Sequence, residues 1–179
     1  MLDITKLLQY SIRLDHEIAE DREIIMSAKK SLENVFVSLD VELAEIANTS
    51  EWFKVWKTHR GKSDPDKTAR ETLLTEYVDA LDFFLLLSAK LKWTHLIVLD
   101  RDGILKLKNG RPTELNKEYL AIKHMLYNSY FENRQEDFRH AWRLFLKMGF
   151  VEFGFSESEI MDAYFDKYQI NEERQANDY

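Results

Sequence analysis

Residues that break helices are scarce along this chain. The 179 residues include only five glycines and two prolines, whereas 45% of the residues are hydrophobic and 13% are aromatic. Such a chain favours long helices over a turn-rich β architecture, and its apolar content is too high for a disordered protein. The length suits one domain, residues 1–179, with a substantial buried core. We therefore predict an all-α fold, a helical bundle of about five to six helices.

The spacing of apolar and capping residues predicts where these helices lie. Asp66 or Thr68 is expected to cap the third helix after a polar loop over 58–67. Ser156 and Glu159 form a capping box before the last helix. The expected helices span residues 4–30, 31–57, 68–92, 113–130 and 135–148, with the last one beginning at 156.

Residues 93–112 do not show one clear period. Apolar runs flank an Asp-Arg-Asp-Gly sequence in this segment. The pattern is compatible with a β-hairpin, or with the end of a helix followed by a mobile insertion. Both alternatives stay open on the sequence alone.

Charge and cysteine content argue against several classes of protein. The chain has no cysteine, which excludes disulfides and Cys-based zinc sites. Its net charge of −7, from 25 basic and 32 acidic residues, disfavours a general nucleic-acid-binding protein. No apolar run is long enough to span a membrane, and the first residues lack the form of a signal peptide. We expect no nucleic-acid partner, no membrane association and a cytoplasmic location.

Four acidic residues indicate a metal site. Glu42 and Glu45 are three positions apart on one expected helix, and Glu76 and Asp79 repeat that spacing on the next. The connecting loop is long enough for the two helices to pack antiparallel, which would bring the pairs face to face. Bare carboxylates would repel one another, and a hard divalent cation relieves that repulsion. Oxygen-only ligands favour Mg²⁺, with Mn²⁺ as a possible substitute, over Zn²⁺.

Two other interpretations of the acids are a solvated helix face and a ferritin-like di-iron site. A single pair at this spacing most often lies on a solvated or salt-bridged helix face. Two pairs in apolar surroundings on consecutive helices favour a metal site more strongly than one pair does. A ferritin-like di-iron site usually requires Glu-x-x-His, whereas His124 and His140 follow Ala121 and Asp137 at that spacing.

Three segments of the sequence resemble the dimeric, all-α dUTPases, a family grouped with the MazG-like nucleoside triphosphate pyrophosphatases. Residues 42–48, followed by Phe-Lys-x-Trp at 53–56, look like the first metal motif of that family. Residues 76–83 are similar to its second metal motif. The C-terminal segment resembles its closing Tyr-x-x-Lys-x-x-x-Asn-x-x-Arg-Gln-x-x-x-Tyr motif through Tyr164, Lys167, Asn171, Arg174, Gln175 and Tyr179.

The resemblance implies an activity, the hydrolysis of a deoxynucleoside triphosphate to the monophosphate and pyrophosphate. For dUTP the products are dUMP and pyrophosphate. Glu42, Glu45, Glu76 and Asp79 would hold Mg²⁺, which neutralises phosphate oxygens and acidifies a water. That water attacks the α-phosphorus, with Glu42 or Glu45 as its base. The resemblance also implies a homodimer.

The C-terminal motif is implied to bind the triphosphate. Lys167, Asn171 and Arg174 are spaced i, i+4, i+7, which places two cations and an amide on one helical face. Without the resemblance, an exposed surface face would be the commoner interpretation of such a stripe. Lys54 and Tyr179 are weaker phosphate-binding candidates.

Asn48, Trp56 and Phe83 are implied to form the base pocket. Aromatic rings would stack on a pyrimidine while an amide reads its edge, although a single buried aromatic residue is more often ordinary core. Ser11 is the fourth base-side candidate, because it stands where the family usually has a glutamine that helps to read uracil.

Base-side residues depart from the family pattern more than the acids do. Ser11 replaces the usual glutamine, Ala80 and Asp82 stand where the second motif commonly has glycine and histidine, and Asp178 replaces the final glycine. A pyrophosphatase for dCTP, or for both dCTP and dUTP, is therefore an alternative. A catalytically inactive helical module that binds another protein is a further alternative.

Overall fold

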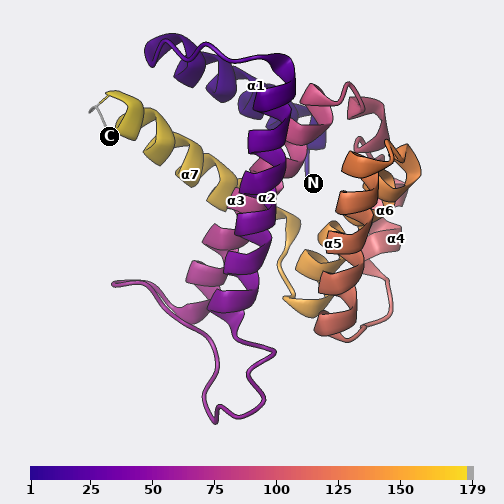
Figure 1. Ribbon diagram of the computed structural model, residues 1–179. Coiled ribbons are helices and arrows are strands. Elements are labelled where there is room, and N and C mark those ends of the chain that lie inside the picture. Colours follow the sequence, from indigo (N-terminus) through magenta and orange to yellow (C-terminus); the bar gives the residue numbers. More distant parts are fainter. Residues whose placement is uncertain (177–179) are drawn as a thin grey trace.

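Helices make up the ordered structure of this protein (Figure 1). A computed structural model describes the backbone of residues 1–176 and the side chains of residues 1–173, and no strand occurs in that part. The all-α prediction is confirmed. The α-helices are α1 (Ile4–Asp21), α2 (Ala28–Ser50), α3 (Ala69–Lys90), α4 (Arg101–Lys108), α5 (Leu115–Phe131), α6 (Gln135–Lys147) and α7 (Glu157–Ala176).

The long helices α2 and α3 form an antiparallel pair at the centre, joined at one end by the loop over 51–68 (Figure 1). Helices α1 and α7 pack against α3 on one side of this pair. Helices α5 and α6 pair with each other on the other side, and α4 packs against α6. Helix α3 therefore contacts α1, α2 and α7, the helices that carry most of the remaining candidate residues.

The first two helices end earlier than their apolar periodicity predicts. Helix α1 ends at Asp21, because Glu23 adopts a left-handed backbone (φ 50°) that no α-helix tolerates. Ser27, not Ser31, caps α2 by accepting a hydrogen bond from the N–H of Lys30. Helix α2 stops at Ser50, not near residue 57, because Glu51 is also left-handed (φ 56°).

Capping boxes begin the two later helices that carry site residues. The Glu71 carboxylate accepts from the N–H of Thr68 at 2.7 Å, and Thr68 Oγ1 accepts from the N–H of Glu71 at 3.2 Å. Ser156 and Glu159 repeat this exchange at 2.8 and 3.2 Å at the start of α7. Both helix starts agree with the sequence prediction.

The segment over 93–112 is helical, so the hairpin alternative is wrong. A 3₁₀ turn (Thr94–Leu96) precedes α4, and Asp100 caps α4 by accepting from the N–H of Gly103 at 2.7 Å. The apolar runs do not alternate along a strand: Ile97, Val98 and Leu99 connect the 3₁₀ turn to α4, Val98 is exposed, and Ile104 is the buried residue of α4. Ile97 is fully buried, and its carbonyl accepts a hydrogen bond from Trp142 Nε1 at 2.9 Å.

A buried apolar cluster runs without interruption from α1 to α7. Near its centre the Tyr77 ring stacks on Phe145 with centroids 4.5 Å apart, and the Tyr77 hydroxyl donates to the Phe145 carbonyl at 3.2 Å. A five-residue π-helical turn (Met148–Glu152) then leads from α6 towards α7. Among the helices that the structure describes, none is both long and apolar enough to cross a membrane.

Candidate active site

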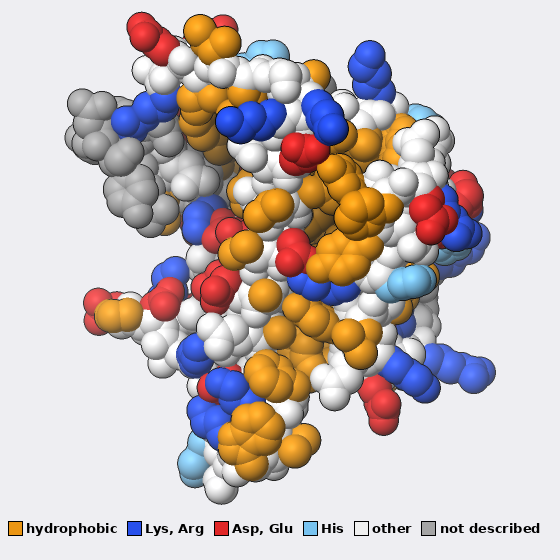
Figure 2. Space-filling view, viewed as in Figure 1, with side chains coloured by type: hydrophobic (Ala, Val, Ile, Leu, Met, Phe, Trp, Pro, Cys, Tyr) orange, Lys and Arg blue, Asp and Glu red, His pale blue; other side chains and the backbone are white. Residues whose placement is uncertain are grey.

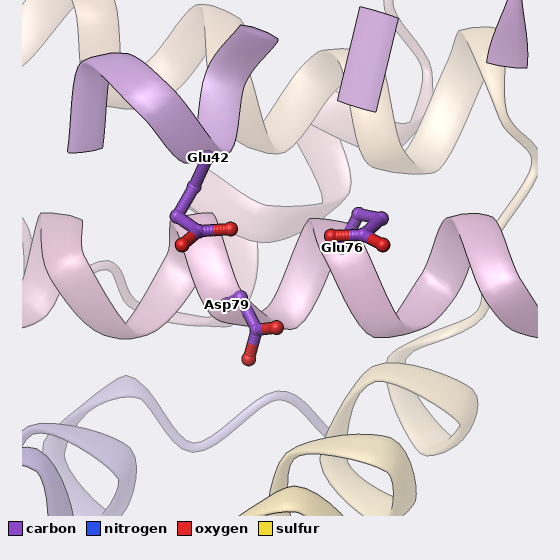
Figure 3. Close-up of side chains that lie close together, drawn as sticks. All are labelled: Glu42, Glu76 and Asp79. Carbon is purple, nitrogen blue, oxygen red and sulfur yellow. The ribbon is translucent and has the colours of Figure 1, made fainter. Parts of the chain in front are cut away.

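Three acidic side chains converge between the central helices (Figure 3). Glu42 projects from α2, and Glu76 and Asp79 project from adjacent turns of α3. One carboxylate oxygen from each lies within 4.8 Å of the other two. The antiparallel packing of α2 on α3 produces this convergence, because it places the two acidic pairs at the same level of the bundle.

The electrostatics of this three-acid cluster indicate an excess of negative charge. Burial raises the pKa of Glu42 to about 7, and the charges of Asp79 and Glu76 add to the effect. Burial and the charge of Asp79 also raise the pKa of Glu76. Burial and mutual repulsion both disfavour the ionised carboxylates, and a bound cation would relieve the repulsion.

One cation already lies at the edge of the cluster. Lys167 projects from α7, and its ammonium donates a hydrogen bond to Asp79 Oδ2 at 2.6 Å. Its positive charge lowers the pKa of both Glu42 and Glu76, although burial and the neighbouring carboxylates outweigh it. Lys167 was expected to bind phosphate, and the structure places it beside the acids.

Glu45 stands one turn of α2 beyond Glu42 and outside the three-acid cluster. Its Oε2 accepts a hydrogen bond from Asn48 Nδ2 at 3.2 Å. The side-chain oxygen Oδ1 of Asn48 in turn accepts a hydrogen bond from Lys62 Nζ at 2.8 Å. The negative charge of Glu45 still raises the pKa of Glu42 and Glu76, so Glu45 borders the cluster.

The donor set of the cluster fits a hard divalent cation. All three groups offer carboxylate oxygens, which Mg²⁺ and Mn²⁺ prefer. The carboxylate oxygens of Glu42, Glu76 and Asp79 would together hold one such ion, which would supply positive charge to the cluster.

A small cavity of about 70 Å³ opens beside Asp79, between α1, α3 and α7. Asp82, Phe83 and Tyr164 form part of its wall, and so do Lys167 and Asn171. A ligand in this cavity would therefore meet aromatic rings, a cation and an amide. The remaining lining residues are Leu14, Val78 and Tyr168.

The side chain of Asp82 is held in place by its neighbours. The Tyr164 hydroxyl donates to Asp82 Oδ1 at 2.5 Å, and Ser11 Oγ donates to the Asp82 carbonyl at 3.2 Å. Desolvation raises the pKa of Asp82. Ser11 itself is buried, so it reaches the cavity through Asp82 rather than lining it.

The predicted base-binding residues lie on two sides of the acids. Asn48 follows Glu42 by six residues, about 9 Å along α2, whereas Phe83 follows Asp79 by four residues, about 6 Å along α3. Because the helices are antiparallel, these displacements point in opposite directions. Trp56 lies beyond Asn48 on the loop over 51–68, 72% exposed, with its ring 6.4 Å from that of Phe53.

The other predicted phosphate-binding residues are Lys54, Arg174 and Tyr179. Lys57 and Lys54 both donate to the Glu51 carboxylate, Lys54 at 2.9 Å, and these two bonds lower the pKa of Glu51 to about 2. Arg174 belongs to α7, but its side chain is outside the described part of the chain, and Tyr179 is outside the described residues.

Two neighbours of the site were given no role from the sequence. Tyr164 belongs to the C-terminal motif, one helical turn before Lys167, and this spacing places both on the same face of α7. Lys62 comes from the polar loop, and its contact with Asn48 carries no periodic signal.

Comparisons with known proteins identify the family of this chain. A family model described as dUTPase matches residues 3–179, and none of the curated proteins compared matches the chain. Because the match leaves out only the first two residues, the chain belongs to the dUTPase family and is an enzyme, a dUTP diphosphatase.

Proposed function

We propose that this protein hydrolyses dUTP to dUMP and pyrophosphate in a Mg²⁺-dependent reaction at the three-acid cluster. The observation that carries the proposal is the convergence of Glu42, Glu76 and Asp79 within 4.8 Å, next to a cationic wall and a cavity. We further propose that residues 1–179 act as one MazG-like domain and pair as a homodimer.

In this proposal Glu42, Glu76 and Asp79 hold Mg²⁺, or Mn²⁺ in its place. When bound, the ion supplies positive charge that neutralises phosphate oxygens and acidifies the attacking water. Glu45 is the better of the two candidate bases, because its carboxylate lies outside the cluster and keeps an oxygen for a water proton. Glu42 then serves as a ligand.

Lys167 and Asn171 orient the triphosphate. Lys167 now neutralises part of the charge on Asp79, and both residues border the cavity. When the carboxylate of Asp79 is engaged elsewhere, the Lys167 ammonium is free to donate to phosphate oxygens instead. The resemblance of the C-terminal motif assigns Arg174 to the triphosphate as well.

The cavity beside Phe83 would receive the deoxyribose and the edge of the base, with Ser11 fixing the backbone of Asp82 behind it. Trp56 would contact the nucleotide only after the loop over 51–68 rearranges, and Asn48, which lies on α2, only when a second protomer supplies it. The carboxylate of Asp82 also supports a second candidate substrate, dCTP, because a hydrogen-bond acceptor suits the amino group of cytosine.

Pyrophosphate release tests the proposal. Purified protein is assayed with Mg²⁺ against dUTP, dCTP, dTTP, dATP, dGTP and UTP, with EDTA and Glu45→Ala as negative controls. Glu136→Gln is the matched control, because Glu136 is an exposed acid on α6 that pairs only with Arg139 among the described residues. Selective dUTP turnover that EDTA and Glu45→Ala abolish is the expected result.

Other outcomes are equally informative. Turnover of dCTP together with dUTP would assign dual specificity. Undiminished turnover in EDTA would overturn the metal proposal, and full activity of Glu45→Ala would remove Glu45 as the base.

A further inference from the structure

A hydrogen-bonded bridge connects the loop over 51–68 with Glu45. Lys62 Nζ donates to Oδ1 of Asn48 at 2.8 Å, and Nδ2 of Asn48 donates to Oε2 of Glu45 at 3.2 Å. Lys62 is exposed on the loop, whereas Asn48 and Glu45 are partly buried on α2. We call these three side chains the amide bridge. It joins a surface ammonium to the acid that borders the three-acid cluster.

The backbone of the loop fixes the position of Lys62. Its N–H donates to the carbonyl of Thr49 at 2.8 Å. Thr49 lies in the last turn of α2, where the carbonyls have no partner within the helix. Lys62 therefore stands beside the residue that follows Asn48, and the negative end of the helix dipole favours a cation there. Figure 2 shows Lys and Arg side chains grouped at the lower end of the molecule, where Figure 1 places this loop.

The ammonium of Lys62 sets the orientation of the Asn48 amide. A lysine ammonium only donates and a carboxylate only accepts, whereas an asparagine amide has an oxygen that accepts and a nitrogen that donates. With its oxygen towards Lys62, the amide satisfies both neighbours. The reversed amide would set its N–H groups against the ammonium and its oxygen against the carboxylate of Glu45. Lys62 therefore selects the orientation in which Asn48 donates to Glu45.

The amide bridge constrains the carboxylate of Glu45. Among the described residues, Asn48 provides the hydrogen bond to Oε2, and Oε1 stays available for a water proton. A glutamate side chain without such a contact rotates freely, and fixing it costs conformational entropy that the hydrogen bond offsets. The orientation of Glu45 therefore depends on a residue of the loop that is two hydrogen bonds away.

We propose that Lys62 is a positioning residue, which acts through Asn48 to hold the Glu45 carboxylate towards the attacking water. The inference rests on the proposed function, in which Glu45 is the base. Because Trp56 lies on the same loop, movement of this loop would change the nucleotide contact and the orientation of Glu45 together. Asn48 keeps a second N–H and a second lone pair, so the bridge leaves it able to meet a nucleotide bound by a second protomer.

Lys62→Met tests the role of the ammonium alone, because the backbone N–H that bonds to Thr49 is retained. We expect kcat for dUTP to fall about tenfold, because a loosely held base spends less time in the reactive geometry. KM for dUTP and the affinity for Mn²⁺ should stay within about twofold of wild type, because the hydrogen bonds of the bridge reach none of the three clustered acids. Lys62→Arg should restore most of kcat, since a guanidinium also only donates.

Lys29→Met is the matched control, because it removes an exposed ammonium from the first turn of the same helix, about 24 Å along α2 from Glu45. Its kcat should equal that of wild type. A double-mutant cycle with Asn48→Ala then asks whether Lys62 acts through the amide. If it does, adding Lys62→Met to Asn48→Ala should lower kcat by less than about twofold. Effects that multiply, or a raised KM with unchanged kcat, would show that Lys62 acts on the substrate directly and would overturn the positioning role.

The failure of this inference can be told apart from the failure of the catalytic proposal. Where the wild-type protein turns over dUTP and Glu45→Ala does not, an unchanged kcat in Lys62→Met overturns the positioning role alone. An inactive wild-type protein, or a fully active Glu45→Ala variant, overturns the catalytic proposal and the positioning role with it. Circular dichroism of each variant checks that a lost kcat does not come from misfolding.

Discussion

The ammonium of Lys167 lies 2.6 Å from Asp79 Oδ2, so a positive charge from α7 reaches the acids that α2 and α3 bring together. This contact joins the C-terminal helix to the candidate metal centre. A divalent cation and Lys167 would compete for the same carboxylate, while a triphosphate would attract both.

Replacing Lys167 should therefore separate metal binding from substrate binding. We expect Lys167→Met to bind Mn²⁺ several-fold more tightly in the absence of nucleotide, because Asp79 loses its competing cation. The same variant should lose about 100-fold or more in kcat/KM for dUTP, because a charge-assisted phosphate contact is missing. Calorimetric Mn²⁺ titration and steady-state kinetics measure the two effects.

Lys108→Met is the matched control, because Lys108 forms an ion pair of similar length, 2.7 Å, with Glu157 away from the acids. It should leave both quantities unchanged. If Lys167→Met weakened Mn²⁺ binding, the competition argument would be wrong.

The raised pKa of Glu42 predicts how the stability of the metal-free protein changes with pH. The folded protein holds the Glu42 proton up to about pH 7, whereas the unfolded chain releases it near the usual value of 4.5. Stability in EDTA should therefore fall as the pH rises from about 4.5 to about 7. Because the side chain is only half-buried, solvent screening limits the contribution of Glu42 to about 1–2 kcal/mol.

Urea denaturation in EDTA at pH 5 and pH 8 measures this dependence. Glu42→Gln cannot ionise, so its stability should fall less between the two pH values than that of the wild type. Mg²⁺ should restore stability to the wild type at pH 8 and much less to the variant. An equal pH dependence in both proteins would contradict the role assigned to Glu42.

Helical periodicity was sufficient to predict the acids and the main helices. Glu76 and Asp79 lie three residues apart on an unbroken helix, and the capping box of Thr68 fixes where that helix begins. The left-handed residues Glu23 and Glu51 were not predictable, because neither is the glycine or asparagine that usually signals such a turn. Spacing along a helix therefore predicted the acidic residues of the site better than it predicted the helix ends.

Contacts between distant segments were beyond the sequence. The antiparallel packing of α2 and α3 was predicted, but the motif alone does not show that this packing separates Asn48 from Phe83. The contact of Lys62 with Asn48 depends on the path of an irregular loop. Tertiary packing, rather than local propensity, decides such relationships.

A buried ion pair network away from the active site should be essential for folding. Lys147 Nζ lies 2.7 Å from Oε1 of both Glu118 and Glu152, and each glutamate has a second carboxylate oxygen that is buried without a hydrogen-bond partner. Lys147→Met would leave two buried carboxylates with no cation, at a cost of about 3–5 kcal/mol. Urea denaturation should show this loss.

The triple variant Glu118→Gln, Lys147→Met, Glu152→Gln is the informative comparison. It removes all three charges together, so it should recover a large part of the stability that Lys147→Met loses. A triple variant no more stable than the single one would indicate that packing, rather than uncompensated charge, dominates at this position.

Gly149 should tolerate no side chain, because it lies against the ring of Tyr77, the residue that follows Glu76. A Cβ at Gly149, in the π-helical turn after α6, would stand 2.4 Å from the hydroxyl and ring of Tyr77. Tyr77 is fully buried and stacked on Phe145, so it has no room to move. Gly149→Ala should therefore cost about 2–3 kcal/mol through overpacking.

Gly154→Ala is the control, since a Cβ at Gly154 meets no atom within 4 Å and strains only a left-handed backbone (φ 66°), at about 1 kcal/mol. Thermal unfolding ranks the two variants, and a Gly149→Ala protein as stable as Gly154→Ala would show that the π-helical turn yields more readily than the Tyr77 ring. Because Tyr77 adjoins Glu76, Gly149→Ala should also weaken Mn²⁺ binding, whereas Gly154→Ala should not.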